Sequence, residues 1–216
     1  MERLFELNRN GKELLGIIHF PDRKVVDEPS PCVIMCYGFN GNRRETNRIS
    51  VKFARRLAEK GIACVRFDYI GCGISAGDFY QSTIENRVND VKEVIHFVSS
   101  LPLIQKKSIH LVGFSDGCRV VLNVALDLLN EIRSISLWSP ILIDEKADEQ
   151  MENEGNIPKL VRNKISGQFF YSYLGLWVHP NYFNPLHDIY VNKMKQVLNV
   201  IPSLSVVGGN DPRNKD

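Results

Sequence analysis

The sequence predicts an α/β fold in which helices cover both faces of a mostly parallel sheet. Two observations lead to this fold class. Short apolar runs, typical of buried strands, alternate along the chain with longer segments of helical periodicity. Several of these runs are continuously apolar, as parallel strands buried on both faces are. The 216 residues, 44% of them hydrophobic, suffice for one substantial core, so we expect a single domain over residues 1–216.

The chain opens with a predicted β-hairpin. Residues 4–7 and 14–20 are strand-like and flank Asn10-Gly11, a dipeptide suited to a two-residue turn with positive φ. We expect these two strands to lie antiparallel at one edge of the sheet.

The remaining elements follow as strand and helix pairs. Gly61 ends one predicted helix, Ser82 to Glu85 form a capping box that opens the next, and Pro102 closes it. The expected strands are 32–37, 62–67, 109–114, 135–139 and 204–208, and the expected helices are 49–60, 84–101 and 118–130.

Residues 141–202 interrupt this alternation. A charged run at 144–154 precedes a segment rich in aromatic residues. An insertion of this length is commonly a lid or cap, although the aromatics could equally pack an ordinary crossover helix. Aromatic walls suit acyl or aryl substrates, so we take Gln168, Phe169 and Tyr173 as candidate substrate-binding residues.

Composition argues against several classes of partner. The formal charge is +2 and the basic residues are scattered, with only Asn42-Arg43-Arg44 as a short patch, so nucleic acid is not an expected partner. No apolar stretch reaches the length of a membrane span, and the N-terminus lacks a signal-peptide core. We expect a cytoplasmic protein that does not bind membranes.

The cysteines point to no metal or redox site. The chain has no C-x-x-C pair and no Cys/His cluster with zinc spacing, and buried free thiols are the expected state. Asp68 to Gly73 superficially resembles a phosphate-binding loop, but it does not open a helix and lacks the lysine of a P-loop. No metal or organic cofactor is expected.

One pentapeptide carries the main chemical signal. Gly113-Phe114-Ser115-Asp116-Gly117 joins a predicted strand to a predicted helix, which is the context of a nucleophile elbow. Glycine at 113 and 117 would avoid clashes in so tight a turn. We expect Ser115 to have a sparsely populated backbone conformation and to face a cleft beneath residues 165–190. The alternative is an ordinary turn with a serine at the start of the helix.

Four motifs in order resemble the α/β-hydrolase fold, in particular small bacterial esterases of the cinnamoyl or feruloyl type. The likeness extends over residues 4–211. Its motifs follow the third, fourth, fifth and seventh strands: Cys36-Tyr37-Gly38-Phe39-Asn40-Gly41, residues 66–75, residues 113–117 and Gly208-Gly209-Asn210-Asp211.

The resemblance assigns roles to these residues. It implies that Ser115 is the nucleophile, that the N–H groups of Phe39 and Asp116 form the oxyanion hole, and that Asp211 is the acid of the triad. Asp116 could instead satisfy the helix start, and Asp211 could be a turn residue. Tyr37 replaces the histidine usual before this glycine, which alters hydrogen bonding in the loop, and it is a further candidate substrate-binding residue.

The histidine of the triad is not found where the resemblance places it. Only five residues follow Asp211, and none is a histidine. We therefore expect a domain that is C-terminally incomplete, without the eighth strand and last helix. His187 is an alternative base, and His179 a weaker one. We expect His19, His96 and His110 to be structural.

The function that the motifs predict is hydrolysis of small-molecule carboxylic esters or thioesters through an acyl-enzyme, with the catalytic histidine absent from the chain. The alternatives are a non-catalytic ligand-binding protein of the same fold and an acyltransferase. Without an eighth strand, residues 204–207 would form an apolar edge, for which we expect self-association into a homo-oligomer.

Overall fold

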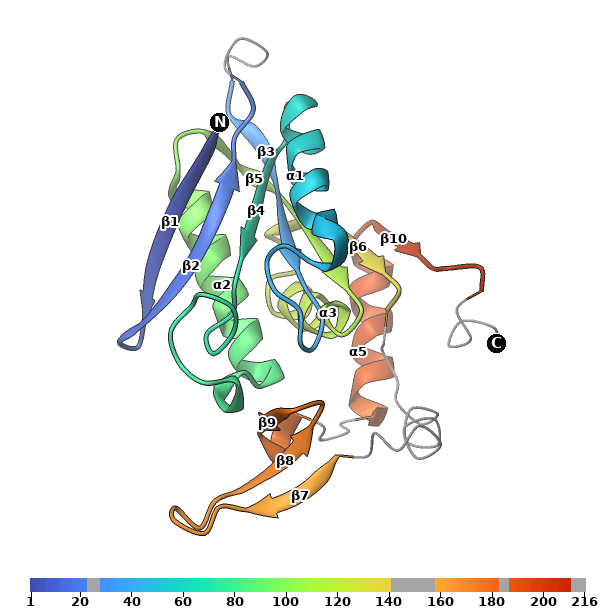
Figure 1. Ribbon diagram of the computed structural model, residues 1–216. Coiled ribbons are helices and arrows are strands. Elements are labelled where there is room, and N and C mark those ends of the chain that lie inside the picture. The colour runs from blue at the N-terminus through green and yellow to red at the C-terminus, as the bar shows by residue number, and fades with distance from the viewer. Residues whose placement is uncertain (23–27, 141–157, 183–186, 211–216) are drawn as a thin grey trace.

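The computed structural model describes residues 1–22, 28–140, 158–182 and 187–210 (Figure 1). A seven-stranded sheet has the order β1-β2-β4-β3-β5-β6-β10, and a separate three-stranded sheet has the order β7-β8-β9. None of the helices in these residue ranges combines the length and the apolar character of a membrane span.

The predicted hairpin is confirmed. β1 (Glu2–Arg9) and β2 (Lys12–His19) pair antiparallel through a turn in which Asn10 has φ 54° and Gly11 has φ 80°. β2 also pairs antiparallel with β4, so the hairpin forms one edge of the large sheet.

The other strands of the large sheet are parallel, as predicted. β5 begins five residues earlier than expected and β6 three residues earlier. The polar start of β5 was not expected to be a strand, but Ile104 pairs with Ser30 at the start of β3 and brings it into the sheet. These strands are β3 (Ser30–Cys36), β4 (Ala63–Phe67), β5 (Ile104–Phe114), β6 (Ile132–Trp138) and β10 (Ser203–Val206).

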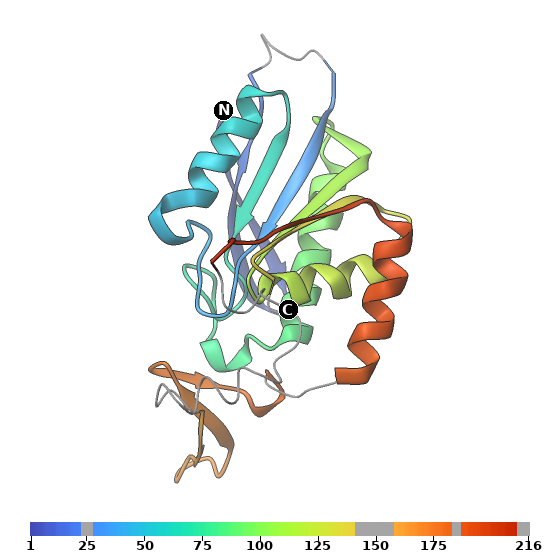
Figure 2. The same cartoon turned by 90° about the vertical axis from the view of Figure 1, so that its right-hand side faces the viewer.

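Helices cover both faces of this sheet (Figure 2). α1 (Ile49–Glu59) packs over one face through Ala54, in a small cluster with Val33 and Val112. The opposite face holds the larger core and is covered by α2 (Ile84–Ser100), α3 (Gly117–Asp127) and α5 (His187–Val200).

The start of α2 differs by one residue from the predicted capping box. The N-cap is Thr83, whose hydroxyl accepts a hydrogen bond from the Asn86 N–H at 3.1 Å. Ser82 is not the cap because its hydroxyl accepts a hydrogen bond from Arg87 Nε at 2.8 Å.

The expected insertion consists of two different parts. β7 (Lys159–Arg162), β8 (Phe169–Tyr173) and β9 (Leu176–Val178) form the small sheet, which lies at one end of the molecule (Figure 1). α5 then leads back into β10, and its Val197 joins the main core. The aromatic segment is therefore separate from the crossover helix. The charged run at 144–154 lies outside the described residues.

Candidate active site

Ser115 occupies a strained turn between β5 and α3. Its φ is 54°, in the left-handed region that residues other than glycine seldom adopt. The Ser115 N–H donates to the carbonyl of Trp138, at the end of β6, over 2.8 Å. The predicted backbone conformation of Ser115 is confirmed, and strain of this kind is often found at functional sites.

The glycines on both sides of Ser115 are required by space. A Cβ on Gly113 would lie 2.7 Å from Cys118 Cα, and a Cβ on Gly117 would lie 2.3 Å from the carbonyl oxygen of Cys36. Both contacts are with backbone atoms, which cannot rotate away. The expectation that a side chain at either position would strike a neighbouring strand or helix is confirmed.

The loop after β3 comes directly against the serine. A Cβ on Gly38 would lie 3.2 Å from Ser115 Cβ and 3.5 Å from Ser115 Oγ. Glycine at 38 thus lets the backbone that carries Phe39 approach the serine oxygen. Phe39 and Ser115 were predicted to belong to one site, and the structure places the residue before Phe39 in contact with Ser115.

Asp116 follows Ser115 and is 6% exposed. Its carboxylate accepts one hydrogen bond from Arg119 at 2.9 Å and another from the hydroxyl of Tyr182. The side chain forms no capping hydrogen bond with α3, so the interpretation of Asp116 as a helix-capping carboxylate is wrong. The carboxylate instead links α3 to the segment that follows the small sheet.

Phe39 lies in an aromatic cluster that joins the two parts of the molecule. Its ring centroid lies 5.2 Å from that of Phe79, 5.5 Å from that of Tyr173 and 4.9 Å from that of Tyr182. Phe79 belongs to the short helix η2 (Phe79–Gln81) after β4, and Tyr182 to η3 (Pro180–Tyr182). The predicted substrate-binding residue Tyr173 is thus beside Phe39.

Two other predicted substrate-binding residues lie farther along the small sheet. Phe169 has a half-exposed side chain, and its carbonyl accepts a hydrogen bond from the Tyr80 hydroxyl at 3.3 Å. Gln168 is exposed in the loop between β7 and β8, directly before β8. Neither has a described contact with Phe39 or Ser115.

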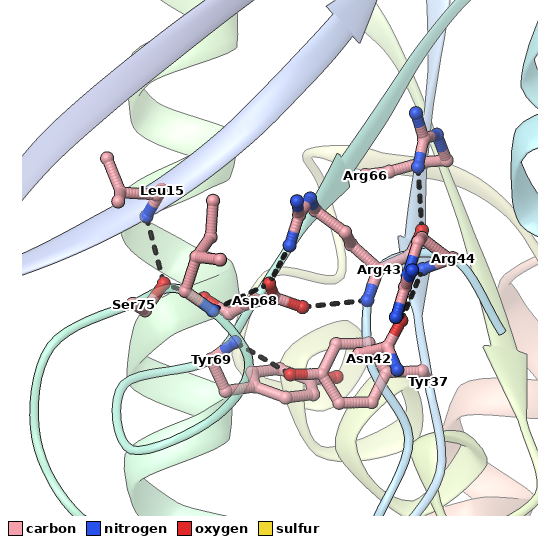
Figure 3. A network of polar contacts seen from close by, with 10 residues as sticks. Leu15, Tyr37, Asn42, Arg43, Arg44, Arg66, Asp68, Tyr69 and Ser75 are labelled. Atoms are coloured by element: carbon pink, nitrogen blue, oxygen red, sulfur yellow. Dashed lines mark hydrogen bonds and ion pairs between the residues drawn. The ribbon is translucent and has the colours of Figure 1, made fainter.

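Tyr37 is buried and holds two loops together. Its hydroxyl accepts a hydrogen bond from the Tyr69 N–H at 3.0 Å, and the two rings lie 4.6 Å apart (Figure 3). Burial raises the pKa of Tyr37 well above its usual value, so the hydroxyl stays protonated. The structure places this side chain in the core, where it supports the loop that leads to Gly38.

Asp68 organises the loop after β4. Its carboxylate accepts hydrogen bonds from the Arg43 N–H at 2.7 Å, from the Arg43 guanidinium and from the Ile74 N–H at 3.1 Å (Figure 3). A Cβ on Gly73 would lie 2.1 Å from this carboxylate. The Asp68 carboxylate therefore occupies the interior of this loop and joins it to the loop that carries Arg43.

Three of the described histidines hydrogen bond to groups other than Ser115. His19 Nε2 accepts a hydrogen bond from Arg66 at 2.9 Å, His110 Nδ1 lies 2.7 Å from Ser134 Oγ, and His179 Nδ1 accepts from the Asn181 N–H at 3.1 Å. His96 is exposed on α2. In the part of the chain that the structure describes, no histidine hydrogen bonds to Ser115.

Two predicted catalytic residues cannot be placed at the site. Asp211 lies outside the described residues. His187 is the first residue of α5, and its side chain also lies outside the described part.

The cysteines do not offer a competing nucleophile. All five are buried and free, as predicted. Cys118 follows the elbow directly, but burial raises its pKa to about 12, so it is a neutral thiol near pH 7. Cys36, at the end of β3, is shifted to about 12 for the same reason.

A polar cleft of about 870 Å³ lies between α2, α3 and the segment after the small sheet. Its lining includes Tyr80, Asn86, Arg119, Asn123 and His179. Ser115 is not among its lining residues. We expected Ser115 to face a cleft beneath residues 165–190, and this cleft does not meet that expectation.

Comparison with known proteins agrees with this geometry. A sequence model of the alpha/beta hydrolase fold matches residues 31–170. The quorum-quenching protein AidA of Acinetobacter baumannii (strain MDR-ZJ06) is 33% identical over 104 residues, or 48% of this chain and 33% of that protein. An uncharacterized 31.7 kDa protein of Escherichia coli is 33% identical over 87 residues, or 40% of this chain and 29% of that protein.

The solved structure of Est1E from Butyrivibrio proteoclasticus, with ferulic acid bound, superposes with a TM-score of 0.64. It is 18% identical and the match covers 94% of this chain and 89% of Est1E, a likeness that shows the shared fold. The two curated relatives are longer, and this chain covers only about a third of each. The family match spans most of the large sheet, the elbow and the start of the small sheet, and the chain therefore belongs to the alpha/beta hydrolase fold family.

Proposed function

We propose that this protein is a serine hydrolase of carboxylic esters or thioesters that acts through an acyl-enzyme. The observation that carries the proposal is the approach of Gly38 to Ser115 Oγ, at a serine held with φ 54°. Such a pair of loops brings backbone donors and a nucleophile to one point, which is the requirement for acyl transfer.

Each step has a residue assigned to it. Ser115 Oγ attacks the acyl carbon while a base removes its proton, and the carbonyl oxygen becomes an oxyanion. The N–H groups of Phe39 and Asp116 would stabilise that oxyanion. The C–O or C–S bond of the substrate then breaks, and the base returns the proton to the departing alcohol or thiol. Water completes the cycle by the same route and releases the acid.

Two histidines are candidates for the base, one outside residues 1–216 and one within the chain. The sequence leads us to expect a histidine outside residues 1–216, oriented by Asp211. His187 is the alternative within the chain. Either assignment requires neutral imidazole near Ser115, because serine is a weak nucleophile without an adjacent base.

An acyl group with aromatic or extended apolar character suits the residues around Phe39. The rings of Phe79 and Tyr173 pack with it and would form one wall for such a group, supported from behind by the buried ring of Tyr182. Est1E binds ferulic acid, an aromatic acid, and AidA is a quorum-quenching protein. Tyr173 is the best supported of the predicted substrate-binding residues, and Phe169 and Gln168 would act only on the larger part of a substrate.

A ligand-binding protein without catalysis is the second candidate. The observation that favours it is that no described histidine hydrogen bonds to Ser115. Such a protein would retain the aromatic cluster and bind acyl compounds without turnover.

The first test compares hydrolysis of p-nitrophenyl butyrate and of a butyryl thioester by the 216-residue chain, Ser115→Ala and His187→Ala. Without a general base, the chain is expected to hydrolyse both substrates within about tenfold of Ser115→Ala, since loss of one triad member removes most turnover. Strong activity that is lost in both variants would make His187 the base. Strong activity that survives in Ser115→Ala would refute the proposal.

A further inference from the structure

A buried arginine contacts the loop that carries one proposed oxyanion donor. Arg87, on α2, is 0% exposed. Its guanidinium donates hydrogen bonds to two successive carbonyls, those of Gly38 at 3.0 Å and Phe39 at 2.6 Å. Nε donates to Ser82 Oγ, so three arms of the guanidinium are fixed by separate acceptors.

Aromatic rings surround the charge of Arg87, with no ion-paired carboxylate among the described residues. In the described part of the chain, no carboxylate oxygen lies within ion-pair distance of its guanidinium. Aromatic rings surround it instead, a favourable setting for a desolvated cation. Their centroids lie 4.8 Å (Tyr69), 5.3 Å (Tyr182), 5.8 Å (Phe79) and 5.9 Å (Tyr37) from Arg87 Cζ.

The two hydrogen bonds determine which way the loop's N–H groups point. In a trans peptide the C=O and the following N–H point in opposite directions. The Gly38 carbonyl is directed at Arg87, so the N–H of Phe39 is directed away from it. Gly38 itself lies against Ser115. The guanidinium therefore fixes the orientation of the N–H that is assigned to the oxyanion.

We propose that Arg87 is a positioning residue for the oxyanion hole, an inference that rests on the proposed serine hydrolase function. Its planar fork holds two carbonyls at once, which the single ammonium group of lysine cannot reproduce. The guanidinium also lies on the carbonyl side of the loop peptides. Their dipoles therefore point away from Arg87, toward the place where the oxyanion's negative charge develops. Preorganised dipoles of this kind lower the cost of forming an oxyanion.

The first experiment measures the loop directly. Amide hydrogen exchange is followed residue by residue in the 216-residue chain, in Arg87→Lys and in Arg87→Gln. Arg9→Met is the matched control, because Arg9 also binds α2, through Asp90 at 2.6 Å, without contacting the loop. We expect exchange at Phe39 to rise about tenfold or more in both Arg87 variants, with the sheet unchanged, since a freed loop opens locally. An equal rise in Arg9→Met would overturn the proposal.

The second experiment separates positioning from packing. When the Ser115 hydroxyl adds to phenylboronic acid, boron becomes a tetrahedral anion and the hydroxyl proton is released to the buffer, whereas benzamide stays planar and neutral. We expect Arg87→Lys to weaken boronate binding about tenfold or more relative to benzamide, because the oxyanion donors bind the tetrahedral anion more strongly than a neutral amide oxygen. An unchanged ratio overturns the proposal for Arg87.

The variant Ser115→Ala distinguishes a failure of the serine hydrolase proposal from a failure of the Arg87 proposal. Boronate binding that persists in Ser115→Ala refutes the serine hydrolase itself. Binding that requires Ser115 but ignores Arg87 refutes only the positioning role. If neither Arg87 variant folds, Arg87 is required by the core as a whole, and the specific role in the loop is likewise overturned.

Discussion

The hydroxyl of Tyr182 donates a hydrogen bond to the carboxylate of Asp116, the residue that follows Ser115. Tyr182 lies in η3, directly after the small sheet, whereas Asp116 directly precedes α3, which packs on the large sheet. Both side chains are buried. This bond attaches the segment next to the aromatic cluster to the proposed nucleophile turn, so the position of one depends on the other.

Removal of this hydroxyl is expected to cost stability. Among the described residues, Tyr182→Phe leaves the buried carboxylate with only the side-chain hydrogen bond from Arg119, and a hydrogen bond to a charged group contributes about 1.5–3 kcal/mol. Urea unfolding measures the difference. Tyr80→Phe is the matched control, because its hydroxyl bonds a carbonyl at the surface, and it is expected to change stability by less than about 0.5 kcal/mol. Equal effects in the two variants would contradict this account.

The elbow glycines give a steric prediction. Gly117→Ala places a methyl group 2.3 Å from the Cys36 carbonyl oxygen, and overpacking of this kind typically costs about 1–3 kcal/mol. Gly209→Ala is the control, since nothing lies within 4 Å of the added carbon. Thermal unfolding of the two variants tests the difference. A Gly117→Ala protein as stable as wild type would show that the turn is looser than described.

His19 gives a pH-dependent prediction. Burial, and to a lesser extent the charge of Arg66, lowers the pKa of His19 to about 4 in the folded state. A lowered pKa means that the stabilisation is complete above the unfolded value near 6.5 and is lost as pH falls toward 4. Between pH 7.5 and pH 5 we expect His19 alone to account for a loss of about 2 kcal/mol.

The variant His19→Gln keeps an acceptor for Arg66 but takes up no proton. Urea unfolding at pH 7.5 and pH 5 is expected to show a smaller acid loss in this variant than in wild type. The pKa of Asp90, which burial raises to about 6, acts in the opposite direction in both proteins and cancels in the comparison. An identical acid loss would show that His19 does not control it.

The free edge of the large sheet gives a prediction about assembly. β10 ends the strand order and no described strand pairs with its outer side, while Leu204 and Val206 are 60% and 47% exposed. We propose self-association through this edge. Leu204→Lys is expected to weaken association by about tenfold or more, and Leu160→Lys, equally exposed on the small sheet, to leave it unchanged. Sedimentation of wild type as a monomer at high concentration would contradict the proposal.

Local signals explain which features could be predicted. The hairpin depends on Asn10-Gly11 and the elbow on five consecutive residues, so both could be read from the sequence. The small sheet could not, because its strands are short and their pairing is set by register between segments rather than by a strong local pattern. The polar start of β5 could not be predicted either, because these residues are in a strand through pairing with β3 rather than through a local pattern.

The two supporting residues of the site were missed for a different reason. Tyr182 was one of several aromatics in the insertion, and nothing local distinguishes it. Arg87 carries a charge and was not considered for the core. Its position is informative nonetheless, since it lies three residues after Ile84 and four before Val91, within the apolar stripe of α2. A charged residue inside such a stripe indicates a buried polar contact.

The most direct test of the central claim is Ser115-dependent hydrolysis by the chain extended at its C-terminus with a strand, a histidine and a helix from a related hydrolase. The account predicts that the extended chain hydrolyses activated esters or thioesters and that Ser115→Ala lowers this turnover by about 10⁴-fold or more. A folded extended chain that remains as inactive as its Ser115→Ala variant toward both substrate classes would contradict the account and favour a protein that only binds acyl compounds.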